Sequence, residues 1–305
     1  MWRVIFETTQ RLQKHYKTCT LYNMNTKRLF LFAGYNAKGV IDDALVHYIK
    51  SLSKFGDIVL VMDSNCPKAE LKKVQKHCVY TNANRHGEYD FGSYKRAYIW
   101  ATENLKLADY DFVYMVNDSV YGPFFDLGPY LTELESYNVD AFGLVQKPHE
   151  HKAHIQSWFI GMHPSIFLTP WYDDFMRTIT KLKDKGAITR LYEIGFSQMI
   201  SAHNLKRKCM YSVHNRGVYN KVKHLYKARM PFMKKVAFDR HFGALGRQIL
   251  YVLNELSPDL HTKILTSAYD QYGEKNVKHV LTKNPIRILS RHVRYALYKF
   301  FIKGI

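Results

Sequence analysis

The chain has 305 residues, of which 47% are hydrophobic and 15% are aromatic. This composition is that of a folded protein with a core, and it excludes a disordered, collagen-like or linker protein. The formal net charge is +19. So large an excess of cations indicates an anionic partner: nucleic acid, a membrane surface or a phosphorylated substrate.

The charge is concentrated in the last third of the chain. Residues 1–203 contain 24 Lys and Arg against 21 Asp and Glu, whereas residues 204–305 contain 21 against 5. The first part therefore reads as a near-neutral globular region, and the basic excess belongs to the remainder. The four cysteines form no CxxC pair, which predicts reduced thiols in a cytoplasmic protein. No stretch has the length and apolar content of a membrane span, and residues 1–6 do not resemble a secretory signal.

The first half of the chain alternates strand and helix patterns. Strands are expected at 28–33, 57–63, 78–81 and 111–116, and helices at 40–53, 67–76 and 92–106. The runs DIVLVMD and DFVYMV are apolar in their interiors, as in strands that are buried on both faces. The alternation predicts an α/β fold on a parallel sheet with right-handed crossovers.

Beyond residue 126 the pattern is less regular. Strands are expected at 140–145, 155–162 and 209–213, helices at 171–182 and 188–202, and basic helical segments after them. These patterns divide the chain into an N-terminal extension (1–26), an α/β domain (27–215) and a basic, mainly helical region (216–305).

Polar loops follow the predicted parallel strands, at 34–38, 63–65, 82–93 and 117–122. In sheets of this kind, ligands bind at the carboxyl ends of the strands. We therefore expect the loops to form one binding edge that carries the chemistry.

Asn117-Asp118-Ser119 follows the buried strand DFVYMV. Asp118 at that place can hold Mg²⁺ or Mn²⁺ against a diphosphate, because both ions bind carboxylate and phosphate oxygens together. The alternative is that Asp118 caps the following turn, to which Ser119 also contributes.

The loop at 82–93 combines amides, carboxylates and a guanidinium between a strand and a helix. Arg85 can pair with a phosphate, and Asp90 can bond a ribose or a base edge. A helix that starts near Ser93 favours an anion at that end. As a polar connection alone, the loop has no specific signature.

Glu193 lies among apolar residues of the predicted helix 188–202. A carboxylate in such surroundings is costly unless it is paired or catalytic. The sequence leaves two interpretations open: a catalytic base, or a capping or ion-paired residue with Arg190 as its partner.

Three histidines, His149, His151 and His154, lie in one loop. Their spacing matches no closed zinc site, and no cysteine accompanies them. This favours a solvated or substrate-facing loop.

Several segments together resemble one known family. In chain order they are YNAKGVIDDALVHYIKSL, DIVLVMDSN, NRHGEYDFGSYKRA, YDFVYMVNDSVYGPF, HIQSWFIGMHPSIF, YEIGFSQMI and PFMKK. They resemble the rhamnan synthesis protein F family of bacterial polysaccharide glycosyltransferases over residues 28–235. The resemblance implies a GT-A-like (Rossmann-like) fold with a mostly parallel central sheet flanked by helices. It also implies an inverting mechanism and a nucleotide-sugar donor linked through UDP or dTDP.

The resemblance also implies roles for individual residues. Asp118 takes the metal–diphosphate position, beside Asn117 and Ser119, and Glu193 becomes the base that deprotonates an acceptor hydroxyl. The donor-binding residues that it implies are Asp63, Asn84, Arg85, Asp90 and Lys95. A single carboxylate stands where the Asp-x-Asp pair is common. The sequence therefore allows a weakly held Mg²⁺ or Mn²⁺, or metal-independent catalysis that Arg85 or Lys95 assists.

The basic C-terminal region predicts where such an enzyme works. Residues 275–305 contain eight Lys and Arg and no acid. Apolar residues recur there near helical spacing, at Ile286, Leu289, Val293, Leu297, Phe300 and Phe301. A basic amphipathic helix of this kind is typical of an anionic membrane surface, and the alternative is a helix packed on the domain.

We therefore expect a peripheral protein on the inner face of the bacterial plasma membrane. It would add rhamnose or a galactofuranose-like sugar to a lipid-linked glycan of an O-antigen, capsule or cell wall. One alternative function is nucleic-acid binding. No nucleic-acid recognition motif appears in the sequence, so we do not expect nucleic acid as a partner. The other is a non-catalytic nucleotide-sugar-binding module.

Overall fold

The computed structural model describes residues 26–148 and 153–302, without the side chains of residues 185 and 295–302. The predicted extension (except Thr26), His149, His151 and the side chains of Leu297, Phe300 and Phe301 lie outside the described residues. The chain divides into two compact units, and each is described by itself. The first is Met1–Ile41, Leu45–Asp118 and Phe125–His214, and the second is Asp42–Ala44, Ser119–Phe124 and Asn215–Ile305.

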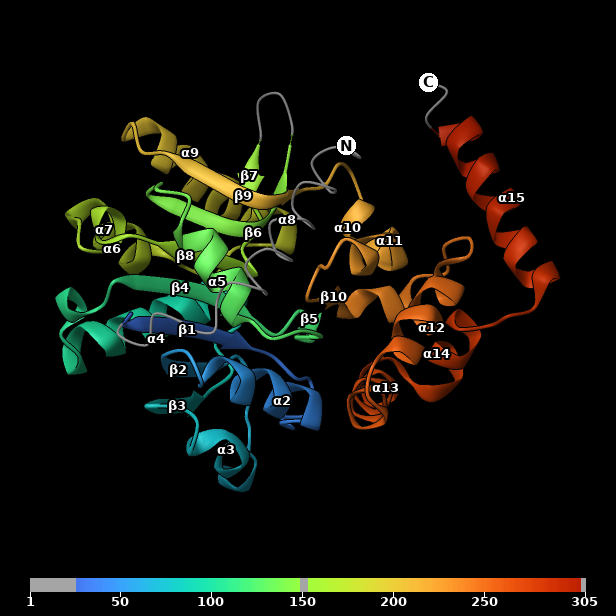
Figure 1. Ribbon diagram of the computed structural model, residues 1–305, viewed down its shortest axis with the longest axis horizontal. Coiled ribbons are helices and arrows are strands. Elements are labelled where there is room, and N and C mark those ends of the chain that lie inside the picture. The colour runs from blue at the N-terminus through green and yellow to red at the C-terminus, as the bar shows by residue number, and fades with distance from the viewer. Residues whose placement is uncertain (1–25, 149–152, 303–305) are drawn as a thin grey trace. The chain divides into compact units, whose positions relative to one another are not determined.

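A sheet with the strand order β3-β2-β1-β4-β8-β6-β7 forms the centre of the first unit, and β9 also pairs with β6 (Figure 1). The strands are β1 (Arg28–Gly34), β2 (Asp57–Met62), β3 (Tyr80–Ala83), β4 (Phe112–Asn117), β6 (Ala141–Lys147), β7 (His154–Ile155), β8 (Phe159–Met162) and β9 (Arg207–Ser212). Strands β1 to β4 are parallel neighbours, and β9 is parallel to β6. Strand β8 runs antiparallel to β4 and β6, and β7 runs antiparallel to β6.

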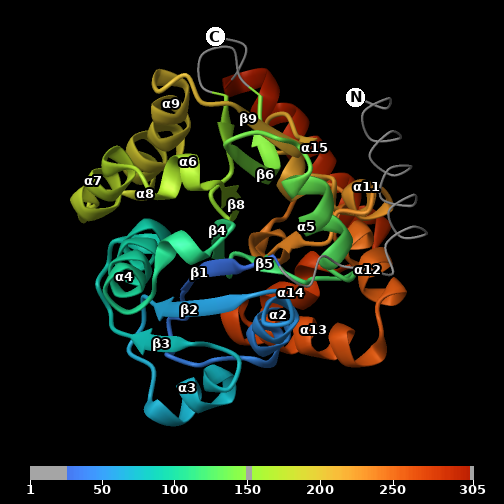
Figure 2. The same ribbon diagram turned by 60° about the vertical axis from the view of Figure 1, so that its left-hand side comes forward.

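Helices cover both faces of this sheet (Figure 2). They are α2 (Asp43–Leu52), α3 (Lys68–Gln75), α4 (Tyr89–Asn104), α5 (Gly128–Glu135), α6 (Pro164–Phe167), α7 (Pro170–Thr178), α8 (Lys185–Ile188) and α9 (Gly195–Ala202), with the 3₁₀-helix η1 (Leu107–Asp109) and the π-helix η2 (Thr189–Ile194). Alternate residues of β1 point to opposite faces. Leu29 and Leu31 pack in the core cluster that includes Tyr94 of α4, whereas Phe32 contacts Tyr48 of α2. The expected α/β class, a mostly parallel sheet between helices, is confirmed.

Two expected elements are divided in the structure. The single strand expected at 155–162 is interrupted between β7 and β8, where Nε1 of Trp158 donates to Oε1 of Gln156 at 2.8 Å. The helix expected at 188–202 contains the π-helix before α9. Hydrophobic spacing did not reveal the first change, because the residues of β7 and β8 are all buried. It did not reveal the second, because a π-helical turn alters the backbone hydrogen bonds within a continuous helical pattern.

Other boundaries moved by a few residues. Helix α4 begins at Tyr89, three residues before the expected start, and α2 begins at Asp43, three residues after it. Just before α2, the N–H of Ile41 donates to Oε2 of Glu70 at 2.7 Å. This hydrogen bond to a side chain holds Ile41 outside the helix, and the spacing of hydrophobic residues does not reveal it.

The second unit is mainly helical. Its elements are β5 (Val120–Tyr121), α10 (Gly217–Asn220), α11 (Val222–Lys227), β10 (Met233–Lys234), the 3₁₀-helix η3 (Lys235–Asp239), α12 (Leu245–Glu255), α13 (Pro258–Tyr272), α14 (Glu274–Val280) and α15 (Pro285–Ile302). Ile249 of α12, Ile264 of α13 and Val277 of α14 are fully buried in one core cluster. Among the helices that the structure describes, none has the length and apolar composition needed to cross a membrane.

Candidate active site

The carboxyl ends of β1 to β4 lie side by side at one edge of the sheet. In the parallel registers Gly34 pairs with Met62, and Ala33 pairs with Asn117. Met62 in turn pairs with Ala83 of β3. The loops after the four strands therefore begin next to one another, as the sequence predicted.

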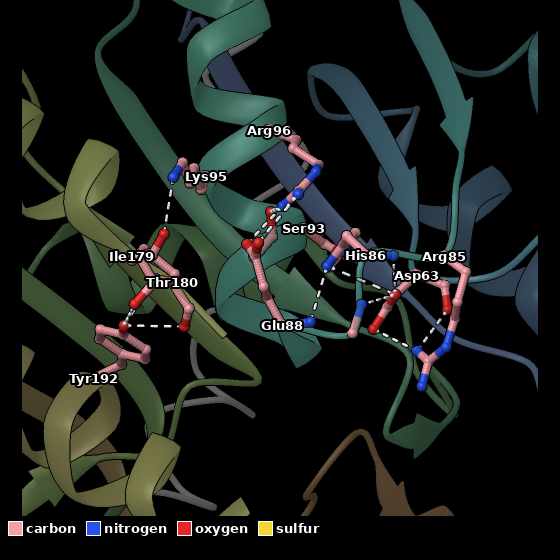
Figure 3. Close-up of polar contacts among 12 residues, drawn as sticks. Asp63, Arg85, His86, Glu88, Ser93, Lys95, Arg96, Ile179, Thr180 and Tyr192 are labelled. Atoms are coloured by element: carbon pink, nitrogen blue, oxygen red, sulfur yellow. Dashed lines mark hydrogen bonds and ion pairs between the residues drawn. The ribbon is translucent and has the colours of Figure 1, made fainter. Parts of the chain in front are cut away.

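The carboxylate of Asp63, just after β2, binds the loop between β3 and α4 (Figure 3). Its Oδ1 accepts hydrogen bonds from the N–H groups of His86 and Gly87, both at 2.8 Å. Its Oδ2 forms an ion pair with Nη1 of Arg85 at 2.6 Å. The Asp63 side chain is buried, so these charge-assisted bonds replace its hydration. Both carboxylate oxygens thus engage the loop that carries Arg85.

Arg85 presents a fixed cation at this edge. Its side chain is 49% exposed, and its guanidinium carbon lies 5.0 Å from the ring centroid of Tyr35, the residue after β1. Nη1 also donates to the carbonyl oxygen of Asp63 at 3.0 Å. A guanidinium has five N–H donors, so groups beyond Nη1 remain to bind a phosphate.

His86 fixes the first turn of α4. Its Nδ1 accepts the N–H of Glu88 at 3.1 Å, so Nε2 carries the proton that bonds Oγ of Ser93 at 3.0 Å. Glu88 in turn binds Nη1 of Arg96 at 2.8 Å. Asp63, His86 and Ser93 follow the order of a hydrolase triad. The geometry excludes that chemistry, because Ser93 is fully buried and Nδ1 of His86 is occupied by a backbone donor.

A second set of contacts joins β4 to α4. Nδ2 of Asn117 donates to Oδ2 of Asp90 at 3.0 Å, and the buried hydroxyl of Tyr94 donates to the carbonyl oxygen of Ser157 at 2.8 Å. Burial, and then the charge of Asp90, raise the pKa of Tyr94 well above its usual value, and Glu193 adds to this effect. The Tyr94 hydroxyl therefore lies close to Asp90, Asn117 and Glu193, three residues that the sequence had singled out.

Glu193 lies in the π-helix and is 19% exposed. Its Oε1 is 3.4 Å from Nε2 of His154, and its Oε2 accepts a hydrogen bond from Oγ of Ser157 at 3.3 Å. The side chain that contacts Oε1 of Glu193 is thus the imidazole of His154, whereas the sequence had suggested Arg190 as a partner. π-Helical turns occur frequently at functional sites. Sequence reasoning missed Tyr94 and Ser157 and left His154 unassigned, and only the buried hydrophobic pattern around them was visible.

Asp118 follows β4 and is buried. Its N–H donates to the carbonyl oxygen of Ala33 at 3.1 Å, which ties it to the end of β1. Burial, and then the charge of Asp118, raise the pKa of Tyr48 well above its usual value. Ser119 belongs to the second unit, where its Oγ accepts a hydrogen bond from Nζ of Lys234 at 2.8 Å.

The two remaining donor-binding candidates differ in setting. Asn84 is exposed next to Arg85, and its N–H donates to the carbonyl oxygen of Met62 at 3.1 Å. Nζ of Lys95 donates to the carbonyl oxygen of Ile179 at 2.8 Å. Figure 3 shows this lysine pointing away from Asp63 and Arg85. In this structure Lys95 therefore anchors the segment after α7.

The sequence matches the model of the family described as rhamnan synthesis protein F over residues 38–299. The chain belongs to the rhamnan synthesis protein F family. The match begins at residue 38, whereas the resemblance was expected from residue 28, and it continues past residue 235 to include most of the basic C-terminal region. Membership confirms the enzyme class that the motifs indicated, a glycosyltransferase. A comparison with curated proteins finds no match.

Solved structures of other transferases are distantly similar to this member of the family. S. aureus TarS 1–349 has 10% identity and a TM-score of 0.40, with 90% of this chain and 74% of that chain covered. Its complex with UDP-GlcNAc has 12% identity and a TM-score of 0.39, with 91% of this chain and 76% of that chain covered. The mannosyltransferase Ktr4p from S. cerevisiae has 8% identity and a TM-score of 0.34, with 59% of this chain and 70% of that chain covered. Likenesses of this degree are too distant to transfer a ligand or a residue role.

A divalent metal ion is implied by the resemblance, and the described residues can be tested for it. They contain no group of three or more His, Cys, Asp and Glu side chains placed to hold a metal ion. Mg²⁺, however, is commonly bound by one or two carboxylates together with substrate phosphates. One buried carboxylate, Asp118, at the end of β4 fits that shared mode. It does not form a closed protein cage.

Replacing Asp63 is expected to destabilise the first unit. Asp63→Ala leaves the N–H groups of His86 and Gly87 without their acceptor, and this should lower the free energy of unfolding by about 3 kcal/mol. Urea unfolding measures the difference. The matched control is Asp109→Ala, an exposed carboxylate of η1. Equal midpoints for the two variants would contradict the role given to Asp63.

Acid is expected to weaken the start of α4 through His86. Burial, and then the charge of Arg96, lower the pKa of His86 below its usual value of about 6.5. The folded state therefore favours the neutral ring. The resulting stability is present above the unfolded pKa and is lost as the pH falls through the folded one. Urea unfolding across this range should show a smaller acid loss for His86→Gln than for wild type. The control His77→Gln, at a half-buried position outside α4, also removes a histidine whose pKa is lowered by burial, and it should remove less of that loss.

Proposed function

We propose that this member of the family is an inverting, nucleotide-sugar-dependent hexosyltransferase that extends a bacterial surface polysaccharide. The donor would be a UDP- or dTDP-linked sugar such as rhamnose or a galactofuranose-like sugar. The product would be an O-antigen, capsule or cell-wall glycan. The observation that supports this best is the setting of Glu193, a mostly buried carboxylate held by His154 and Ser157.

Glu193 has the environment of a general base. Its two oxygens are held by different partners, so the orientation of the carboxylate is fixed before an acceptor arrives. In the proposed reaction it takes the proton of an acceptor hydroxyl as that oxygen attacks the anomeric carbon. The bond from that carbon to the diphosphate breaks on the opposite side, which inverts the configuration. His154 and Ser157 act as positioning residues.

The leaving group of the proposed reaction is a nucleoside diphosphate, and its negative charge grows in the transition state. Arg85, fixed by Asp63 and Tyr35, supplies a cation at the strand edge for a phosphate. The Asp90–Asn117 pair lies at the same edge, where Asp90 can accept a hydrogen bond from a ribose hydroxyl. When bound at Asp118, Mg²⁺ or Mn²⁺ would neutralise diphosphate charge.

The acceptor is proposed to be lipid-linked, and the enzyme to work as a peripheral protein at the cytoplasmic face of the plasma membrane. The supporting observation is the charge distribution, because the excess of cations lies after residue 203. An anionic membrane surface attracts such a region electrostatically. The same charge, with the aromatic residues that interleave with the basic ones, also favours nucleic acid, but no recognition motif accompanies it.

The test is release of nucleotide from a panel of UDP- and dTDP-sugars, with and without Mn²⁺, in the presence of glycan acceptors. One donor should be consumed with formation of an extended glycan of inverted anomeric configuration. Binding of a donor without any turnover would favour the non-catalytic module instead. Retention of configuration would overturn the inverting mechanism.

A further inference from the structure

One face of helix α15 is anchored in the second unit. Ile288 and Arg291 are buried there. Nη2 of Arg291 donates to the carbonyl oxygen of His279 at 2.7 Å, and Nη1 donates to that of Val280 at 3.3 Å. These carbonyls end α14, where a cation is favourable. The orientation of α15 about its own axis is therefore set by the unit on which it packs.

The opposite face of α15 displays apolar side chains. Ile286 is 76% exposed, Leu289 is 63% exposed and Val293 is 50% exposed. Their spacing of three and four residues places them in one stripe, which we name the exposed stripe. With about 3.6 residues per turn, the stripe lies on the side of the helix away from Ile288. Exposed apolar side chains that lie side by side are unfavourable in water, and such surfaces often mark an interaction site.

Cations flank the exposed stripe on one side. Arg287 and Arg294 are both exposed. Burial lowers the pKa of His279 at the end of α14, and the nearby charges of His241, Arg291, Arg287 and Arg294 lower it further. Residues 275–302 contain no acid, and the nearest acid of α14, Glu274, is paired with Lys278. No acidic residue of α15 therefore offsets the positive charge of Arg287 and Arg294 beside the exposed stripe.

We propose that the exposed stripe and the two flanking arginines, Arg287 and Arg294, form a docking surface for an anionic lipid membrane. The apolar side chains would enter the headgroup region, and the arginines would bind lipid phosphates. A second copy of the chain would bring like charges together, and nucleic acid would leave the stripe in water. This inference rests on the proposed function for its purpose, and it names the surface and the lipid charge that the proposal leaves open.

Vesicle co-sedimentation of the full chain tests this surface. Wild type should bind vesicles that mix phosphatidylglycerol with phosphatidylcholine, and it should bind pure phosphatidylcholine at least about tenfold less tightly. Arg287→Gln/Arg294→Gln should weaken binding to the anionic vesicles about 30-fold. Ile286→Ser/Leu289→Ser/Val293→Ser should weaken it at least about tenfold, because apolar burial is lost.

Matched variants of the first unit serve as controls. Lys72→Gln/Lys76→Gln removes two exposed cations, and Val79→Ser/Leu168→Ser removes two exposed apolar side chains. Both should bind as wild type does. If the α15 variants also bind like wild type, or if wild type binds neither vesicle or both equally, the docking surface is wrong.

Nucleotide release by wild type without vesicles is measured in parallel. Absence of turnover with intact vesicle binding would overturn the proposed function and leave the docking surface. Turnover without vesicle binding would overturn the docking surface and leave the proposed function.

Discussion

Glu193→Gln is expected to lower kcat about 10³-fold while KM for the donor changes little. The amide keeps the shape of the side chain and can still contact His154 and Ser157, but it cannot accept a proton from the acceptor. The loss should therefore fall on the chemical step. It is measured as the initial rate of nucleotide release at saturating donor and acceptor.

Glu103→Gln is the matched control, because it makes the same change at an exposed position of α4. Its kcat should equal that of wild type. Thermal unfolding of both variants should also match wild type, which separates lost catalysis from lost folding. Full activity of Glu193→Gln in a folded protein would remove Glu193 from the mechanism.

The sheet could be predicted because its pattern is local and strong. Strands such as DIVLVM are buried along almost their whole length, and the helices α2 and α3 follow β1 and β2. Only parallel strands connected through helices satisfy both patterns. The break between β7 and β8 could not be predicted. It depends on strand pairing, because β7 pairs with β6 whereas β8 also pairs with β4, which is distant in sequence.

The candidate site was only partly visible for a similar reason. The positions of Asn117 and Asp118 followed from the end of a predicted strand, and that of Asp90 from the polar segment that follows another strand. The contacts of Glu193 come from His154 and Ser157, which are more than thirty residues away in the chain. Lys95 shows the converse case. The family resemblance implied a donor contact for Lys95, but in the structure its ammonium donates to the carbonyl oxygen of Ile179.

Asp118→Asn is expected to lower kcat/KM about 10²-fold to 10³-fold in the presence of Mn²⁺. The substitution keeps the size of a buried side chain and removes the charge that an ion shared with the diphosphate requires. Because the protein offers one carboxylate there, the affinity for the ion should fall together with the rate. A titration of nucleotide release against Mn²⁺ should therefore shift to higher concentration in the variant.

Asp109→Asn, at the exposed turn η1, is the control and should leave the Mn²⁺ titration unchanged. The two possible mechanisms differ in the wild-type response to a chelator. If chelation leaves wild type fully active and Asp118→Asn is still impaired, Asp118 acts through the fold of the strand end, and Arg85 carries the diphosphate charge. If chelation and the substitution each lower turnover to a measurable residual rate and their effects are not additive, both act on one ion, since removal of either partner then removes the same interaction.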